Sequence, residues 1–466
     1  MTDCNKARDS GLELLRMICM LLIVAYHMVG ATEGWIEYPH FWTWNLVGYH
    51  VIGLWGQTAV LAFVMITGYF MISARTKPSK IIRLALEVWF YSIVIAALLV
   101  WSGKAEWDWS DVGLTLFPLL YREYWFVTDY IILLLLIPLL NKLLRSLSGK
   151  ETVYALGVMV AVAYGCSALM EFEYFGSILF LILFYSLAAA IRLHPIPAFS
   201  RKGIWPVLLM LCIIYSVLLM RLMNGIYQGT AKPLLDFDED PRILWYIGFS
   251  VATMAVISVL PIRRKIIVLA VVGTILLMLS FLAYMPYLGL GTRGPVENRW
   301  SPIIGLSAVS LFMTFKNAGL PYSRIVNWLA GGVLGVYLIH EHWAVKQVMW
   351  ESIFPVDMLM DQWFLPKAVF VLVVLLLGMM LIDKVREALF SLIARARFVR
   401  NVADHLNSRF YNIFDGDSDS RRDDSDRMRP WGQSRRHQSS IVGATSVRNR
   451  RYISNSFPMN RYIRER

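Results

Sequence analysis

The first long apolar stretch of the sequence, residues 11–30, contains three side chains that can take part in chemistry. Glu13, Arg16 and His27 interrupt a run that is otherwise almost entirely apolar. An α-helix turns about 100° per residue, so the step from Arg16 to His27 amounts to three turns plus about 20° and places both side chains on one face. With a rise of about 1.5 Å per residue they lie roughly 16 Å apart along the axis. We therefore expect one face with a cation near one end and an imidazole near the other.

These residue types suggest an acid–base group with an anion-binding group on the same helix. The neutral imidazole of a histidine can remove a proton from a hydroxyl group as a general base, and a guanidinium group binds carboxylates or phosphates through paired hydrogen bonds. Ionisable side chains inside a membrane are costly, which makes them functional candidates. Two other interpretations stay open: Arg16 can extend to lipid headgroups, and His27 can be an interfacial histidine that a neighbour satisfies.

Two further sets of polar residues stand in or beside apolar stretches. His340, Glu341 and His342 are consecutive near the end of the stretch at 329–345, and we expect them in the outer half of the membrane. Adjacent residues of a helix point in different directions, so no metal site is expected there, and a structural polar pair is the alternative. Asp129 can orient a histidine or contact a sugar hydroxyl; otherwise it is an exposed acid at the membrane interface.

The composition indicates that these side chains belong to membrane-spanning helices. Of the 466 residues, 57% are hydrophobic and 17% are charged, whereas ordinary soluble domains are about 25% charged. About 20 consecutive apolar residues cross a bilayer as a helix, and the stretches 11–30, 84–102, 266–290 and 367–383 satisfy this without ambiguity. No cleavable signal peptide is apparent. The sequence therefore predicts an all-α, polytopic transmembrane helical bundle.

The positions of lysine and arginine predict how the chain crosses the membrane. These residues gather in alternate connections, for example 262–265, whereas the intervening connections, such as 223–243, are acidic. The positive-inside rule then places both termini in the cytosol. Because the weaker stretches can be re-entrant or interfacial, we expect 10–12 helices. The twelve apolar stretches are 11–30, 52–72, 84–102, 126–143, 153–170, 176–191, 205–222, 244–261, 266–290, 301–316, 329–345 and 367–383.

Charge and cysteine content exclude some other classes of protein. The net charge of +12 comes from the connections and the C-terminal segment, so nucleic acid is not an expected partner. The four cysteines show neither disulfide nor zinc spacing. Residues 401–466 are polar and arginine-rich, which predicts a disordered, basic cytosolic tail whose arginines can hold anionic lipid headgroups. The expected organisation is a cytosolic N-terminus (1–10), a membrane domain (11–400) and this tail (401–466).

Several short patterns, in order along the chain, resemble the acyltransferase-3 family of bacterial membrane-bound O-acyltransferases. Arg16 and His27 have the spacing of the family's first helix, which also opens with a similar Leu12-Glu13-Leu14-Leu15-Arg16. The family usually has ten core helices. The remaining similar patterns are Thr67-Gly68-Tyr69, Tyr124-Trp125-Phe126 with Pro138-Leu-Leu-Asn141, and Gly335-Val-Tyr337-Leu-Ile-His340.

The resemblance implies transfer of an acyl group, usually acetyl, from cytosolic acyl-CoA to a hydroxyl of a sugar or cell-envelope glycan. It implies a multi-pass enzyme of the cytoplasmic membrane of a bacterium, with acyl-CoA as the donor and no metal. His27 is then the expected general base. The expected catalytic residues are His27, Arg16, His340, Glu341 and Asp129; those for the donor are Arg16, Glu13, Arg75 and Arg83; those for the acceptor are Tyr69, Tyr124, Trp125 and Asp129.

Other functions stay open on the sequence alone. Buried His, Arg and Glu on many spans also suit a proton-coupled secondary transporter or exporter, although no pair of broken helices repeats in two halves. A scaffold or receptor that signals through its tail is a third possibility. The basic connection around residues 75–83 can reflect topology alone, and the aromatic residues near Trp125 can form an interfacial belt. The acceptor, the acyl chain and the oligomeric state are not predictable from these patterns.

Overall fold

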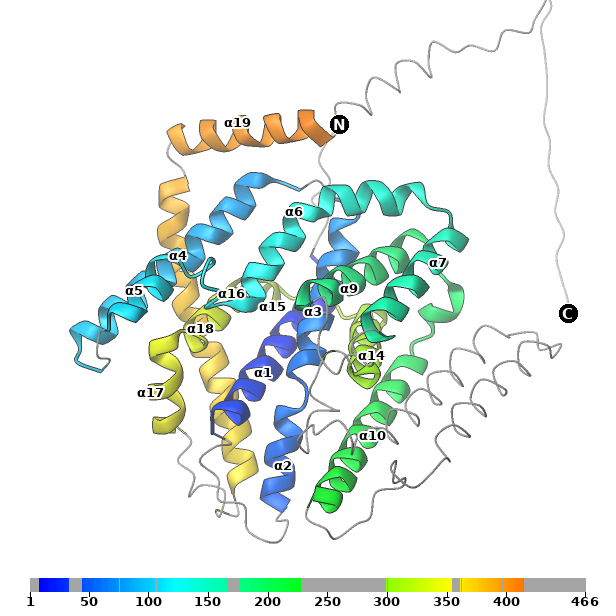
Figure 1. Cartoon of the computed structure of the whole chain (residues 1–466), viewed down its shortest axis with the longest axis horizontal. Coiled ribbons are helices and arrows are strands. Elements are labelled where there is room, and N and C mark those ends of the chain that lie inside the picture. The colour runs from blue at the N-terminus through cyan, green and yellow to red at the C-terminus, as the bar shows by residue number, and fades with distance from the viewer. Residues whose placement is uncertain are drawn as a thin grey trace, which may run out of the picture. The chain divides into compact units, whose positions relative to one another are not determined.

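A computed structural model describes residues 8–32, 44–74, 76–104, 108–165, 176–227, 299, 301–353, 361, 363–394 and 397–414. These residues form an all-α bundle without a strand (Figure 1). Two expected spans, 244–261 and 266–290, lie outside the described residues, and the expected span 153–170 lies partly outside them.

Among the described residues, six helices are long and apolar enough to cross a membrane. Leucine, isoleucine, valine and phenylalanine side chains on the outward faces of several of them are exposed, as expected where lipid rather than water surrounds a helix. The prediction of a polytopic all-α bundle is confirmed. Five of these spans correspond to α1 (Ser10–Thr32), α4 (Pro78–Trp101), α6 (Trp125–Ser146), α9 (Gly176–Leu193) and α18 (Phe364–Ala394), and the sixth is Val51–Met71, which includes α3 (Gly56–Met71).

Further helices lie between and beside these six spans. The expected span 52–72 is divided, because α2 ends at Gly53 and α3 begins at Gly56. The expected span 153–170 begins as α7, which passes into a π-helical turn at Ala161–Gly165. The remaining elements are α2 (Trp44–Gly53), α5 (Trp109–Leu116), α7 (Gly149–Val160), a 3₁₀ turn at Pro197–Ser200, α10 (Ile204–Tyr227) and α14 (Pro302–Ala318).

Helix α1 lies inside the bundle and contacts α2, α3, α14 and α18 as well as the broken helix described below. Small residues allow the close packing that holds these helices together. A Cβ atom on Gly68 of α3 would overlap the backbone of Tyr185 on α9, and one on Gly56 would overlap the ring of Tyr26 on α1. The helix that carries Arg16 and His27 is therefore fixed on several sides.

The expected span 329–345 is not one helix, and this corrects the sequence-based expectation. The chain forms α15 (Arg324–Leu329), a 3₁₀ turn (Ala330–Gly332), α16 (Val333–His340) and α17 (Trp343–Ile353). The regular helical hydrogen bonds stop after Glu341. Beyond this point two backbone amides donate to side chains instead of to backbone carbonyl groups. The amide of Trp343 donates to the carboxylate of Glu123 at 2.8 Å, and that of Ala344 donates to Nδ1 of His342 at 3.2 Å. This break separates α16 from α17.

A buried ionic cluster joins α18 to α4 next to α16. Arg386 donates two hydrogen bonds of 2.9 Å to Asp383 and lies 2.8 Å from Glu87, while the hydroxyl of Tyr91 donates to Asp383 at 2.9 Å. All four side chains are buried. Removing one member of such a cluster leaves an uncompensated charge and typically costs about 3–5 kcal/mol. A Cβ atom on Gly335 of α16 would overlap the carboxylate of Asp383, so glycine is required for this contact.

A last helix, α19 (Arg397–Phe414), follows α18 and lies across the ends of α18 and α4 (Figure 1). The backbone amide of Ser79, in the first turn of α4, donates to the side-chain oxygen of Asn407 at 3.2 Å. The boundary expected at residue 400 therefore does not coincide with the end of the helical structure, because 401–414 are helical. The expected disorder of 415–466 lies outside the described residues.

Candidate functional site

His27, near the end of α1, meets two residues at the end of α16. Its Nδ1 atom lies 2.9 Å from Nε2 of His340 and 2.9 Å from Oε1 of Glu341. The two imidazole rings are tilted by 34° and their centroids are 5.1 Å apart. His340 and Glu341 are buried, and the His27 side chain is 15% exposed. The structure thus brings His27 together with two residues that are more than 300 positions away in the sequence.

A backbone carbonyl determines which nitrogen atoms of the two imidazoles carry hydrogen. Nδ1 of His340 lies 2.7 Å from the carbonyl oxygen of Val336, and a carbonyl can only accept, so Nδ1 carries the hydrogen. In the neutral ring, Nε2 of His340 is then an acceptor, and it faces Nδ1 of His27. His27 therefore donates through Nδ1 and keeps a lone pair on its own Nε2. Among the described residues, no hydrogen-bond partner occupies that Nε2.

Glu341 adds a carboxylate to the histidine pair and connects it to a lysine. Its Oε1 faces His27, and its Oε2 accepts a hydrogen bond of 2.9 Å from Nζ of Lys346. The Lys346 side chain is 45% exposed, so the network reaches from a buried imidazole to the surface. A carboxylate beside an imidazole can stabilise the positive charge that the ring acquires when it takes a proton as a general base.

Two adjacent residues, His340 and Glu341, contact one histidine at the end of α16. Adjacent residues of a helix point in different directions, and this was the reason for expecting no metal site. Both side chains nevertheless reach His27, and the ligand atoms of all three residues lie within 4.8 Å of one another. That reason is therefore wrong, and the absence of a metal stays a prediction. We interpret the 2.9 Å contact between Nδ1 and Nε2 as a hydrogen bond.

The carboxylate of Glu123, just before α6, stabilises the break between α16 and α17. Glu123 precedes α6 and accepts the amide hydrogen of Trp343 at 2.8 Å. Burial raises the pKa of this carboxyl above its ordinary value, whereas the hydrogen bond from Trp343 lowers it. The neighbouring hydroxyl of Tyr124 donates to the carbonyl oxygen of Leu338 on α16 at 3.3 Å. The start of α6 thus holds the end of α16 in place.

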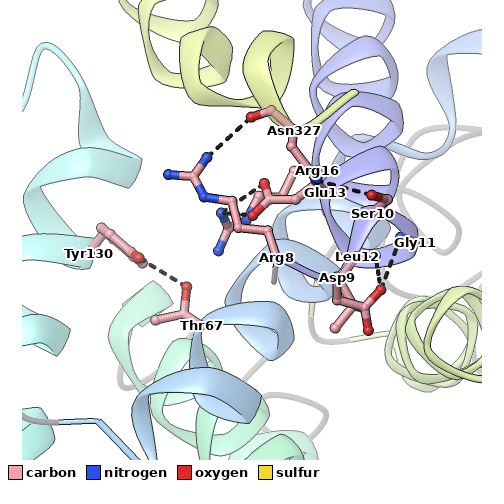
Figure 2. Close-up of polar contacts among 10 residues, drawn as sticks. All are labelled: Arg8, Asp9, Ser10, Gly11, Leu12, Glu13, Arg16, Thr67, Tyr130 and Asn327. Carbon is pink, nitrogen blue, oxygen red and sulfur yellow. Dashed lines mark hydrogen bonds and ion pairs between the residues drawn. The ribbon is translucent and has the colours of Figure 1, made fainter. Parts of the chain in front are cut away.

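Near the start of α1, Arg16 pairs with Glu13. Nη1 of Arg16 lies 3.1 Å from Oε2 of Glu13; the glutamate is buried, and the arginine side chain is 29% exposed. Arg8 donates to the carbonyl oxygen of Asn327 on α15 at 3.1 Å. Figure 2 shows the two guanidinium groups on the same side of the start of α1. We call this region the Arg16 end of the bundle, and the region around His27 the His27 end.

The first turn of α1 is fixed by short polar side chains. Asp9 precedes the helix and accepts the amide hydrogens of Gly11 and Leu12 at 3.0 and 3.3 Å, which satisfies two donors that a helix start leaves free. The hydroxyl of Ser10 donates to the side chain of Asn327 at 3.3 Å and accepts from the amide of Ser323 at 2.8 Å. Arg16 therefore stands on a helix start with a defined position.

Two more cations lie around Tyr69, near the end of α3. The Arg192 guanidinium is 4.8 Å from the Tyr69 ring centroid, and its Nη1 donates to the Tyr69 carbonyl at 3.1 Å. Nζ of Lys316 is 5.8 Å from the same ring. A hydroxyl pair between Thr67 and Tyr130, at 2.9 Å, lies between α3 and α6 (Figure 2). Tyr69 thus stands among basic groups and apart from His27.

Three of the expected site residues do not join the His27 network. Asp129 bonds to Arg122 at 3.1 Å and accepts the hydroxyl of Ser177, so its carboxylate is engaged elsewhere. Tyr124 is fully buried and contacts α16, whereas Trp125 is partly buried beside Arg299, whose guanidinium is 4.3 Å from its ring. Burial leaves Tyr124 without the open ring face that a sugar would need.

The two basic residues expected for the donor are not gathered at Arg16. Arg83 is exposed on α4; between it and either Glu13 or Arg16, all of them described residues, the structure gives no hydrogen bond or ion pair. Arg75 lies outside the described residues.

Sequence reasoning missed Lys346 and Glu123, which complete the His27 end, and did not single out Arg192 and Lys316, which surround Tyr69. Arg192 and Lys316 were visible as basic residues at the ends of apolar stretches, a pattern that topology alone explains. Lys346 and Glu123 carry no local signal, because their roles depend on the break at Glu341.

Comparison with protein families supplies the decisive observation. Residues 9–384, about four fifths of the chain, match the family described as an acyltransferase domain, the acyltransferase-3 type. The chain belongs to the acyltransferase-3 family. The match covers α1 through most of α18, including Arg16, His27, His340 and Glu341. Comparison with curated proteins and with solved structures finds no match.

Family membership and the six apolar helices together make this protein a multi-pass membrane acyltransferase. Membership favours transfer chemistry over the transporter and scaffold that the sequence had left open. The match begins at the start of α1 and ends beside the buried ionic cluster, so α19 lies outside the family domain.

Proposed function

We propose that this acyltransferase moves an acetyl group from cytosolic acetyl-CoA, or a related acyl-CoA, to a hydroxyl of a cell-envelope or exported glycan, with His27 as the general base. Family membership supports the acyl transfer. The observation that carries the assignment of the base is the hydrogen bond between Nδ1 of His27 and Nε2 of His340, because it leaves Nε2 of His27 with a lone pair.

The proposed step is a direct attack of the acceptor hydroxyl on the thioester. Nε2 of His27 takes the proton as the hydroxyl oxygen forms a bond to the acyl carbonyl carbon. The carbon–sulfur bond then breaks, and the proton passes from His27 to the CoA thiolate, so the products are an ester and a free thiol. Glu341 stabilises the imidazolium between these steps, and His340 holds the ring in the required orientation.

The Arg16 end is proposed as the donor side. Arg16, Arg192 and Lys316 stand near one end of the bundle, and guanidinium and ammonium groups bind the phosphates of CoA. Arg16 and His27 lie roughly 16 Å apart along the axis of α1. An extended pantetheine arm can cover this separation and carry the thioester from a phosphate site toward a base deeper in the membrane. The acceptor then approaches from the His27 end.

Replacing His27 tests the proposal. General base catalysis typically contributes roughly 10²–10⁴-fold, so purified His27→Ala should release CoA thiol from acetyl-CoA slower by about that factor, with glycan acetylation followed by mass spectrometry. A matched control is His194→Ala, because His194 is partly buried and bonds to Thr152 at 3.3 Å, at the Arg16 end. A well-folded His27→Ala protein that keeps more than half of wild-type turnover contradicts a general-base role.

A further inference from the structure

Helix α19 presents an apolar face that the rest of the described bundle does not cover. Val399, Val402 and Leu406 are 38%, 42% and 37% exposed. With about 100° per residue, these three side chains fall within an arc of about 60° on the helix. Ala403 and Phe410 lie on the same apolar side and are partly buried. The other side of α19 is polar. Such a face is typical of a helix that lies in the plane of a membrane surface.

Two arginines stand at the edges of this face. On the same helical projection Arg400 lies about 60° beyond Ala403 on one side, and Arg409 lies about 20° beyond Val402 on the other. Both are exposed. Arginine side chains in this position can keep their apolar stems against hydrocarbon while the guanidinium groups reach the headgroups. The flanking charge is therefore complementary to an anionic lipid surface.

The contacts of α19 place this face beside the lipid-exposed surface of the bundle. Asn407, which bonds to Ser79 at the start of α4, lies about 100° from Leu406 on the helix, so the helix is anchored along one side and the apolar face is turned to the flank. The preceding turns of α18 expose Leu389, Leu392 and Ile393. The apolar surface of the transmembrane helix thus continues toward that of α19.

We propose that α19 is a membrane-surface helix that binds the anionic cytosolic leaflet through Val399, Val402 and Leu406, with Arg400 and Arg409 on lipid headgroups. This assigns the lipid contact to a defined helix between the membrane domain and the remaining tail. A bilayer is the occupant that fits, because α19 follows a membrane-spanning helix after only two residues. The inference rests on the transmembrane bundle and is independent of the reaction.

Environment-sensitive fluorophores on single cysteines of the full chain in lipid nanodiscs test the proposal. The four native cysteines are first replaced by alanine, and labels are placed at Val402 and Leu406 or, as matched controls, at Asn401 and Ser408 on the polar side. Labels at 402 and 406 should be quenched by spin-labelled lipid and protected from aqueous iodide, with the reverse at 401 and 408. Equal iodide quenching at 406 and 408 overturns the proposal, and so does protection of 406 from both quenchers, which indicates a protein partner.

The anionic preference is tested with Arg400→Gln and Arg409→Gln in discs with and without phosphatidylglycerol. Each arginine near an anionic surface contributes about 1 kcal/mol, which corresponds to roughly fivefold in the lipid-bound population. Lipid quenching at 406 should rise with phosphatidylglycerol in the parent protein and lose that dependence in the double variant. Identical quenching in neutral and anionic discs contradicts the role of the arginines. Leu406→Glu, with Asn401→Glu as its control, should detach the helix in both kinds of disc.

Discussion

Nε2 of His340 holds the Nδ1–H of His27, which makes His340 a positioning residue in the proposed reaction. His340→Ala should lower turnover about 10–100-fold with little change in KM for the donor, as loss of an orienting partner commonly does. His340→Gln should recover part of that loss, because its amide oxygen can accept the same hydrogen bond. Steady-state kinetics of both purified variants check this. Equal activity of the two variants would contradict a role for the hydrogen bond that His340 accepts.

Replacing Arg16 by lysine tests donor binding more specifically than removing the side chain would. Arg16→Lys keeps the charge but loses the planar fork that binds phosphate or carboxylate through two hydrogen bonds. We expect activity to fall at least about tenfold, mainly through a higher KM for the acyl-CoA, with the pair to Glu13 weakened as well. Near-normal kinetics of the lysine variant would instead support an arginine that extends to lipid headgroups.

The candidate site was partly predictable from the sequence. His27, Arg16 and Glu13 share one continuous helix, so their relation follows from helical geometry. The contact between His27 and Glu341 was not predictable in detail, because it depends on how α16 packs against α1. Asp129 was a candidate to orient a histidine or to contact a sugar hydroxyl, with an exposed interfacial acid as the alternative. Its carboxylate instead bonds to Arg122 and Ser177, and no sequence pattern at either partner predicts this contact.

At the scale of elements, the position of α16 between α1 and α18 depends on glycine. Gly335 contacts Asp383, and a Cβ atom on Gly332 would come within 2.9 Å of the carbonyl oxygen of Met380. On the helical projection His340 lies about 140° from Gly335, so the glycine side faces α18 while His340 faces α1. The ionic cluster thus fixes how α16 is rotated.

Gly335→Ala tests this dependence. The added methyl group overlaps the Asp383 carboxylate, and such overpacking typically costs about 1–3 kcal/mol. We expect a lower melting temperature and slower transfer, because α16 must move or rotate and carries His340 with it. Gly378→Ala on α18 is the matched control, since its Cβ atom would meet nothing within 4 Å. If both variants melt and transfer alike, α18 does not set the position of α16.

The helices themselves were predicted well where an apolar run is uninterrupted, as in α4 and α18. The breaks at Gly53–Gly56 and at Glu341 were not. The apolar pattern continues through the first, and the polar residues 340–342 at the second do not by themselves mark the end of a helix. Their causes are contacts between distant residues, such as Glu123 with Trp343. Hydropathy indicates whether a residue is suited to a membrane. It does not indicate which backbone amides will donate to side chains that are distant in the sequence.

For the whole molecule, the alternating charge predicts that both termini and the Arg16 end face the cytosol. The connections 74–83, 144–152, 192–204, 262–265 and 317–328 should then be protected from outside. A membrane-impermeant maleimide on intact cells should label Lys104→Cys, beyond the end of α4, and should label Lys150→Cys only after permeabilisation. Both positions are exposed. Labelling of Lys150→Cys in intact cells would invert the orientation and the assignment of donor and acceptor sides.

The early end of α16 has an electrostatic effect on the proposed chemistry. The last carbonyl groups of a helix carry partial negative charge, equivalent to about half an elementary charge, and α16 ends at His340, beside His27. A proton captured by His27 therefore arrives next to a helix terminus as well as a carboxylate. Such an arrangement typically stabilises a nearby cation by about 0.3–1 kcal/mol, and by up to about 2 kcal/mol where it is partly buried. If α16 continued beyond Glu341, the partial negative charge of its C-terminus would lie farther from His27. Because α16 ends here, that partial charge lies next to the imidazolium that the proposed reaction forms.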